Sequence, residues 1–140
     1  MSFLIDTNVV SEWVKPWPNP GVVRWTDSSD ENGIFLSVVS LTEIRYGIER
    51  MVPGKRQRRL HEWLRYELPI RFEGRILPVD SRTADACGRI VHRSEILGRP
   101  IEAMDAFIAA TAEVHGLTLV TRNVEDFVVV GQIFNPWTEN

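Results

Sequence analysis

The sequence predicts an α/β domain with a central, mostly parallel β-sheet flanked by helices. Short apolar runs of strand length occur at residues 3–5, 34–37 and 117–121. Longer segments with apolar residues at helical spacing separate these runs. This alternation of strands and helices is typical of βαβ units, which build parallel sheets. The pattern leaves the order of the strands open.

The individual elements are expected from the apolar spacing and from the residues that interrupt it. Prolines at positions 16, 18 and 20 end the first helix, because a proline inside a helix removes a hydrogen bond. Gly116 is expected to cap the helix with the strongest apolar pattern. We expect helices at residues 7–14, 22–27, 40–48, 55–68, 83–97 and 101–115, and further strands at residues 75–79 and 132–135.

Length and charge limit the classes of protein that fit this chain. We expect the 140 residues to form a single domain, residues 1–140, that is long enough for a sizeable core. The formal net charge of -3 excludes a protein that binds nucleic acid through bulk positive charge. It does not exclude a nuclease, because a nuclease that uses metal ions needs an acidic site.

The single cysteine and the N-terminus indicate the compartment. Cys87 has no second cysteine with which to form an internal disulfide, so we expect a small core residue in a reducing compartment. The N-terminal segment lacks the basic region of a signal peptide, and the apolar runs are too short to span a membrane. We therefore expect a cytoplasmic protein without a membrane partner.

Asp6 is the first candidate for the functional site. It directly follows the apolar run at residues 3–5, and open α/β sheets bind their ligands outside the carboxyl ends of the strands. The alternative is that Asp6 only caps the next helix through the free N–H groups of its first turn.

Two further acids are expected at the same edge of the sheet. Asp105 lies in the otherwise apolar or small run at residues 104–112, where burying an unpaired carboxylate is costly. It could instead be stabilised by the helix dipole near the helix start. Glu43 lies in the helix after the second strand, where it could instead form a capping box with Ser40. Several carboxylates in one crevice favour a hard divalent cation, Mg²⁺ or Mn²⁺, which can promote in-line displacement at a phosphodiester.

These acids and their neighbours resemble a known family. The motifs Leu4-Ile5-Asp6-Thr7-Asn8, the mid-chain Glu43, Asp105-Ala106-Phe107-Ile108-Ala109-Ala110-Thr111-Ala112 and Leu119-Val120-Thr121-Arg122-Asn123 occur in this order. Together they resemble the PIN-domain ribonucleases, and more narrowly the VapC-type toxins of type II toxin–antitoxin pairs in their FitB-like branch. The closing Phe134-Asn135-Pro136-Trp137 fits that branch, so the resemblance spans residues 4–137.

The resemblance implies a single PIN-like domain that hydrolyses RNA at a Mg²⁺ or Mn²⁺ site. It implies that Asp6, Glu43 and Asp105 are catalytic, metal-binding acids. It also implies a homodimer, an RNA substrate such as a tRNA or an rRNA, a cognate VapB-type antitoxin that blocks the site, and further assembly with that antitoxin on promoter DNA.

The fourth acidic position is less clear from the sequence. Some relatives have an Asp where this chain has Asn123, so a carboxamide replaces a charged ligand. Asp126 lies three residues later and could supply the missing catalytic and metal-binding carboxylate. We expect Thr7, Asn123, Arg122 and Arg45 to contact the substrate. The alternatives are a helix-start role for Thr7 and structural ion pairs for the two arginines.

Residues 50–59 form a dense basic run in a chain that is acidic overall. The run holds five Lys or Arg residues and no acid. It could contact RNA phosphates, or it could be the solvated start of a helix. Trp13 and Trp17, beside the proline-rich loop, are candidates for contact with a protein partner.

Two other functions remain open on the sequence. Asp6 after a first strand also fits an aspartate-phosphorylated receiver or a phosphatase-like domain. That phosphatase class needs a second Asp two residues later, where this chain has Asn8. A non-catalytic PIN-fold binding module is the other alternative, which the carboxamide of Asn123 favours.

Overall fold

The computed structural model describes residues 1–138 and contains the expected parallel sheet. Its five strands lie in the order β3-β2-β1-β4-β5, and every pairing between neighbours is parallel. The strands are β1 (Phe3–Ile5), β2 (Ile34–Ser37), β3 (Ile76–Leu77), β4 (Thr118–Val120) and β5 (Ile133–Phe134). β1 is therefore the central strand, and the expected last strand lies at the sheet edge.

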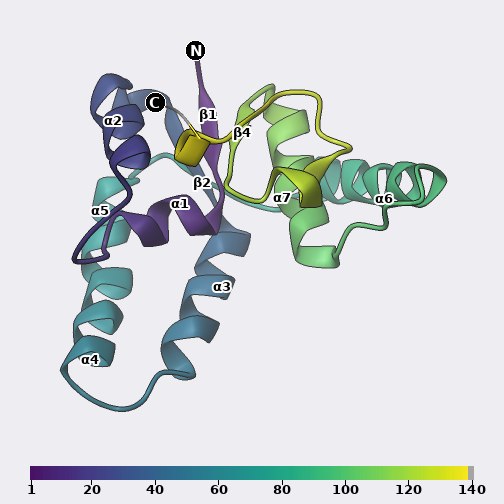
Figure 1. The fold of residues 1–140 in the computed structure, drawn as a ribbon. Coiled ribbons are helices and arrows are strands. Elements are labelled where there is room, and N and C mark those ends of the chain that lie inside the picture. Colours follow the sequence, from purple (N-terminus) through teal and green to yellow (C-terminus); the bar gives the residue numbers. More distant parts are fainter. Residues whose placement is uncertain (139–140) are drawn as a thin grey trace.

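Helices cover both faces of the sheet (Figure 1). One face carries α1 (Thr7–Glu12), α2 (Pro20–Ser28) and α5 (Leu68–Arg71), and the other carries α6 (Ser81–Ile96) and α7 (Ala103–His115). Neighbouring side chains of β1 point to opposite faces, as the pleat of a strand requires. Ile5 packs in the core under α1 and α2, whereas Leu4 packs in the core under α6 and α7. Both residues are fully buried.

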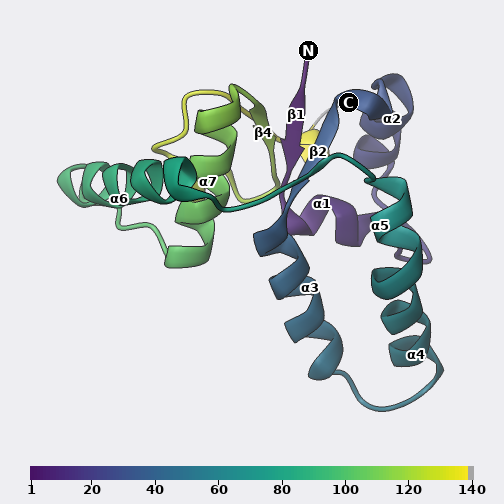
Figure 2. The ribbon, with the colours of Figure 1, turned by 180° about the vertical axis from the view of Figure 1, so that it is seen from behind.

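A helical hairpin extends beyond the sheet (Figures 1 and 2). It consists of α3 (Val38–Glu49) and α4 (Lys55–Glu62), and α4 continues through a π-helical segment, Trp63–Glu67, into α5. The sequence predicts one helix at residues 55–68, but the observed helical path runs on to Arg71. Pro69 does not end this path, because it lies in the first turn of α5, where its missing N–H has little effect.

The predicted capping box of Ser40 and Glu43 is wrong. α3 begins at Val38, and Ser37 is its N-cap, with its hydroxyl accepting a hydrogen bond from the Val39 N–H at 3.0 Å. Glu43 therefore lies in the second turn of α3 and not in its first turn. The error arises because Ser37 and Ser40 are both suitable caps, and only the end of β2 selects between them.

Other helix boundaries differ by a few residues from those expected. α1 ends at Glu12, α2 begins at Pro20 after the Asn19 cap, and α7 begins at Ala103. Gly116 is confirmed as the cap of α7, with a left-handed φ of 64° that favours glycine. The last two residues of the predicted domain, 139–140, lie outside the described part. Within residues 1–138, no helix combines the length and the apolar character needed to cross a membrane.

Candidate active site

Asp6 lies directly after the central strand and is only 5% exposed. Its Oδ2 accepts a hydrogen bond from the Thr121 hydroxyl at 2.7 Å, and its Oδ1 accepts one from the Thr7 N–H at 2.8 Å. The contact with Thr121 follows from the register of the sheet. Ile5 of β1 lies opposite Val120 of β4, so the next residue on each strand reaches the same edge. The helix-cap alternative for Asp6 is thus also realised, because Asp6 is the N-cap of α1.

Glu43 reaches the end of β1 from α3. The Thr7 hydroxyl donates a hydrogen bond to Glu43 Oε1 at 2.5 Å, and Ser40 Oγ lies 2.8 Å from the same hydroxyl oxygen. Thr7 therefore connects Asp6, its neighbour in sequence, to a carboxylate on another element. This contact gives Thr7 a positioning role beyond that of a helix-start residue.

Asp105 and Asp126 line one pocket with a volume of about 430 Å³. Asp105 belongs to the first turn of α7, and Asp126 belongs to the short 3₁₀ helix Val124–Phe127 that follows β4. The loop before α7 supplies a further part of the wall. The other lining residues are Gly98, Arg99, Pro100, Ile101, Glu102 and Glu125.

The charges of Asp6, Glu43 and Asp126 all act on Asp105, so the fold places the four predicted acids in one electrostatic environment. Burial, followed by the charges of Asp6, Glu43 and Asp126, raises the pKa of Asp105 to about 7. Burial also raises the pKa of Asp6, with the charges of Glu43 and Asp126 acting in the same direction. The hydrogen bonds from Thr121 and Thr7 oppose that shift because they stabilise the charged form of Asp6.

No basic side chain forms an ion pair with these four acids within residues 1–138. The ion pairs of this part of the chain involve other acids, such as Glu12, Glu31 and Glu113. Mg²⁺ and Mn²⁺ prefer carboxylate oxygens as ligands, and carboxylates that lie in one environment without ion-pair partners are suited to bind them.

In the described residues, the four carboxylates do not lie close enough together to coordinate one metal ion. No three Asp, Glu, His or Cys side chains of residues 1–138 lie in an arrangement that could bind one ion. The chemistry of the four acids thus fits a divalent cation, while their side chains would have to converge to coordinate it.

Of the residues predicted to contact the substrate, Arg45 is partnered by other side chains, whereas Arg122 and Asn123 are exposed. Arg45 Nη1 lies 2.9 Å from His61 Nδ1 and 3.7 Å from Glu49 Oε2, so its charge is already partnered. Arg122 is exposed and its guanidinium lies 5.6 Å from the centre of the Trp137 ring. Asn123 is exposed, and its backbone N–H donates to Thr121 Oγ1 at 3.0 Å. Asp126, and not Asn123, shares the pocket with Asp105.

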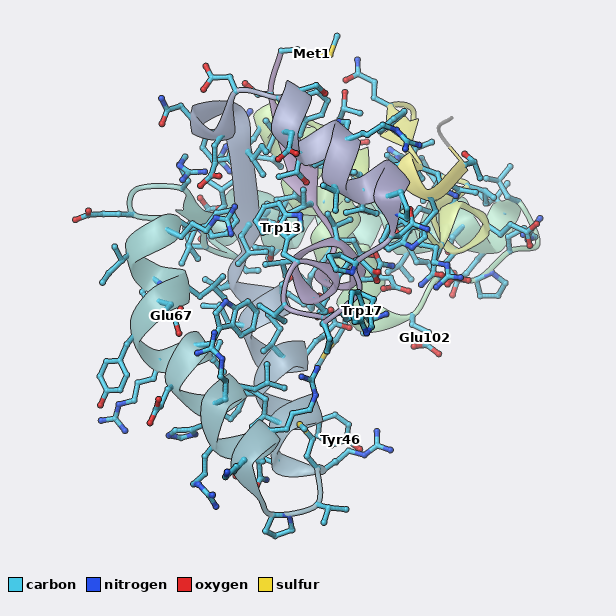
Figure 3. The ribbon with its side chains drawn as sticks, turned by 60° about the vertical axis from the view of Figure 1, so that its left-hand side comes forward. Met1, Trp13, Trp17, Tyr46, Glu67 and Glu102 are labelled. Atoms are coloured by element: carbon cyan, nitrogen blue, oxygen red, sulfur yellow. The ribbon has the colours of Figure 1, made fainter. Side chains whose placement is uncertain are left out.

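The predicted partner contacts separate into one packed and one exposed tryptophan. Trp13 stacks on Phe72, with ring centroids 6.0 Å apart, and its Nε1–H donates to Thr26 Oγ1 at 2.9 Å. Trp17 projects from the loop after α1 and is 90% exposed (Figure 3). Of the two, Trp17 is therefore the one available to a partner.

Three residues at the site were missed in the sequence. Thr121 binds Asp6, Ser40 supports Thr7, and Arg99 lines the acidic pocket and donates weakly to the Glu125 carbonyl at 3.3 Å. Thr121 could have been found, because it follows a buried strand in the same way as Asp6. Ser40 was assigned to the helix cap instead, and nothing in the local sequence around Arg99 places it beside Asp126.

Comparison with known proteins identifies the family. The PIN domain model matches residues 3–131. Toxin FitB of Neisseria gonorrhoeae is 40% identical over 135 residues, which cover 96% of this chain and 97% of that protein. VapC ribonuclease Y4jK of Sinorhizobium fredii is 33% identical and covers 96% of each chain. The solved structure of FitAB bound to an IR36 DNA fragment superposes with a TM-score of 0.90 at 37% identity, covering 99% of this chain and 97% of that one. The chain therefore belongs to the PIN-domain family, in the branch that includes the FitB toxin and the VapC ribonucleases.

Proposed function

We propose that this protein is a Mg²⁺- or Mn²⁺-dependent endoribonuclease that acts as the toxin of a toxin–antitoxin pair. The observation that carries the proposal is the influence of Asp6, Glu43 and Asp126 on the charge of Asp105, with no ion pair to any of the four acids within residues 1–138. Such a group of carboxylates is unfavourable unless a ligand of positive charge compensates it. The names of the relatives, a toxin and a ribonuclease, support the same function.

The four acids would hold the ion, and their neighbours would position them. A bound Mg²⁺ or Mn²⁺ supplies Lewis acidity, which activates water and stabilises negative charge on a phosphodiester. Thr121 fixes one oxygen of Asp6, and Thr7 fixes one oxygen of Glu43, so each carboxylate is held in a defined direction. In the metal-free chain the pKa of Asp105 is raised to about 7, so binding of the cation near neutral pH would displace a proton from this carboxyl group.

The proposed partners follow from the same relatives. FitAB is a complex bound to DNA, which supports an antitoxin partner and further assembly with it on promoter DNA for this chain. We infer a VapB-type antitoxin, a homodimer, and an RNA substrate such as a tRNA or an rRNA. The exposed Trp17 is available for the antitoxin contact.

The phosphorylated-aspartate alternative has less support. Asp6 is 5% exposed and both of its oxygens accept hydrogen bonds, which leaves little room for a phosphoryl group on either oxygen.

The proposal is tested by expressing the chain in bacteria without its antitoxin and mapping the ends of cleaved RNA. We expect growth arrest with new RNA ends at defined sites, and neither effect with Asp105→Asn. Glu113→Gln is the matched control, because Glu113 lies on the same helix but pairs with Arg93 at 2.9 Å outside the acidic pocket. Full toxicity and cleavage with Asp105→Asn would overturn the proposal.

A further inference from the structure

A second groove lies at the far end of α1 from the acids. It has a volume of about 400 Å³ and lies between the segment after α1 and the helix α4. Four of its lining residues are cations, and none is an acid. The lining consists of Trp13, Val14, Lys15, Lys55, Arg56, Arg59, Leu60 and Trp63. We call this surface the basic groove.

Two of the four cations of the groove have no acid as an ion-pair partner in the described part of the chain. Most other Lys and Arg side chains in residues 1–138 pair with an acid or lie over an aromatic ring, as Arg71 does with both Glu31 and Trp13. Lys55 and Arg56 form no ion pair in the described part of the chain, while Lys15 and Arg59 pair with Glu12 and Glu67.

Helix stability does not explain these charges. Lys55 and Arg56 are the first two residues of α4, whose first turn contains no acid. Cations at the N-terminal end of a helix oppose its dipole, whereas an acid there would stabilise the helix. A bound anion would offset this unfavourable placement of positive charge.

The two tryptophans of the groove pack against other side chains of the protein, so the cations are the groups available to a ligand. Trp63 is 7% exposed, and Trp13 contacts both the Phe72 ring and the Arg71 guanidinium, which lies 4.2 Å from its ring centre. Both rings are therefore already engaged in contacts within the chain. The groove therefore suits the phosphates of a nucleic acid strand better than its bases.

The position of the groove fits an RNA strand that also reaches the acids. α1 begins next to Asp6 and ends next to the groove, and its six residues span about 9 Å (Figure 1). The acidic pocket itself repels a polyanion, so a nuclease of net charge -3 needs a local cationic surface to hold its substrate.

We propose that the basic groove formed by Lys15, Lys55, Arg56 and Arg59 binds the phosphate backbone of the RNA substrate outside the catalytic pocket. The proposal rests on the proposed ribonuclease function and names the residues that hold the substrate for it.

The test measures binding of a short fluorescein-labelled oligouridylate to the purified, antitoxin-free chain in EDTA, where cleavage is blocked. The test variant is Lys55→Gln with Arg56→Gln. The control variant, Arg82→Gln with Arg89→Gln, removes two charges from the exposed surface of α6, on the opposite side of the sheet (Figure 1). Thermal unfolding verifies that both variants are folded.

We expect the test variant to bind the oligonucleotide about tenfold more weakly or worse, and the control variant to bind like the parent. The slope of log K against log salt should fall by roughly 0.7 for each phosphate that the variant no longer neutralises, or about 1.4 for the double variant. In the cleavage assay, the test variant should raise KM while kcat at saturating RNA stays near that of the parent.

Three results would overturn the inference: unchanged RNA binding by the test variant, equal weakening by both variants, or loss of antitoxin binding with RNA binding intact. The last result would assign the groove to an acidic segment of the antitoxin. Failure of the proposed function would appear in a different measurement, the cleavage assay. If the parent chain binds RNA but does not cleave it with Mg²⁺ or Mn²⁺, the ribonuclease function is wrong, and the binding constants of the variants can still be compared.

Discussion

The Thr121 hydroxyl donates a hydrogen bond of 2.7 Å to Asp6 Oδ2, although the two residues are 115 positions apart in the sequence. The bond is buried and lies at the carboxyl ends of the neighbouring strands β1 and β4. Thr121 Oγ1 also accepts the Asn123 N–H at 3.0 Å. One hydroxyl therefore fixes the central acid of the site and the start of the segment that carries Asp126.

Replacing Thr121 with Val should destabilise the protein and disturb Asp6. The substitution removes a donor from a buried carboxylate, which costs about 1–3 kcal/mol of the free energy of unfolding. It should also raise the pKa of Asp6 further, because this hydrogen bond lowers it. Urea unfolding measures the loss of stability, and Thr121→Ser, which keeps the hydroxyl, should restore most of it. Equal stability of the Val and Ser variants would contradict the role of this contact.

The raised pKa of Asp105 predicts that the free energy of unfolding of the metal-free protein depends on pH. Its pKa is about 7 in the folded chain against an ordinary value of 3.8, so between those values the folded state binds more protons than the unfolded state. The contribution of Asp105 to the free energy of unfolding therefore falls as pH rises through this window.

The variant Asp105→Asn removes that contribution. It should stabilise the metal-free protein near pH 8 by on the order of 1 kcal/mol, since the side chain is only half-buried and water screens the repulsion. Below about pH 3.5 the gain should vanish, because Asp105 is then protonated in both states. Chemical unfolding in EDTA at both pH values tests this, and a gain confined to low pH would contradict it.

Asp126 is expected to matter more than Asn123. Asp126 shares a pocket with Asp105 and raises the pKa of Asp6, whereas Asn123 does not line that pocket and contributes its backbone N–H to Thr121. Asp126→Asn should lower Mn²⁺ affinity or kcat by roughly 10–100-fold, while Asn123→Ala should change either by less than about threefold. Calorimetry and cleavage rates give the two quantities. The reverse ranking would show that Asn123 completes the site.

Thr7 is expected to act through Glu43. Thr7→Val breaks the 2.5 Å hydrogen bond to Glu43 Oε1 and releases that carboxylate, so Mn²⁺ should bind roughly 10-fold more weakly. Thr7→Ser keeps the hydroxyl and should bind the ion like the parent. If both variants bound Mn²⁺ equally, the hydroxyl would be only part of the helix start.

The fold class and the identity of the acids follow from local signals in the sequence. Short apolar runs define the strands, and an acid directly after β1 falls at the carboxyl end of a parallel sheet wherever that strand lies. Asp105 can be recognised because burying an unpaired carboxylate in an otherwise apolar helical run is costly. Each of these signals is confined to a few neighbouring residues.

The contacts that organise the site depend on tertiary structure. The pairing of Asp6 with Thr121 requires β1 to lie beside β4, and the strand order does not follow from the pattern of elements. Ser37 and Ser40 are equal candidates for the cap of α3 until the end of β2 is known. The basic groove likewise forms only when α4 packs near the end of α1, so the run at residues 50–59 has no assignable role in isolation.

The most direct test of the account is cleavage of a labelled RNA by the purified, antitoxin-free protein with and without a divalent cation. We predict no cleavage in EDTA, cleavage when Mg²⁺ or Mn²⁺ is restored, and a rate at least about 100-fold lower for Asp105→Asn at every metal concentration. Glu113→Gln should cleave like the parent. Cleavage that persists in EDTA, or an Asp105→Asn variant with the full rate, would contradict the assignment of these acids to a metal-dependent ribonuclease site.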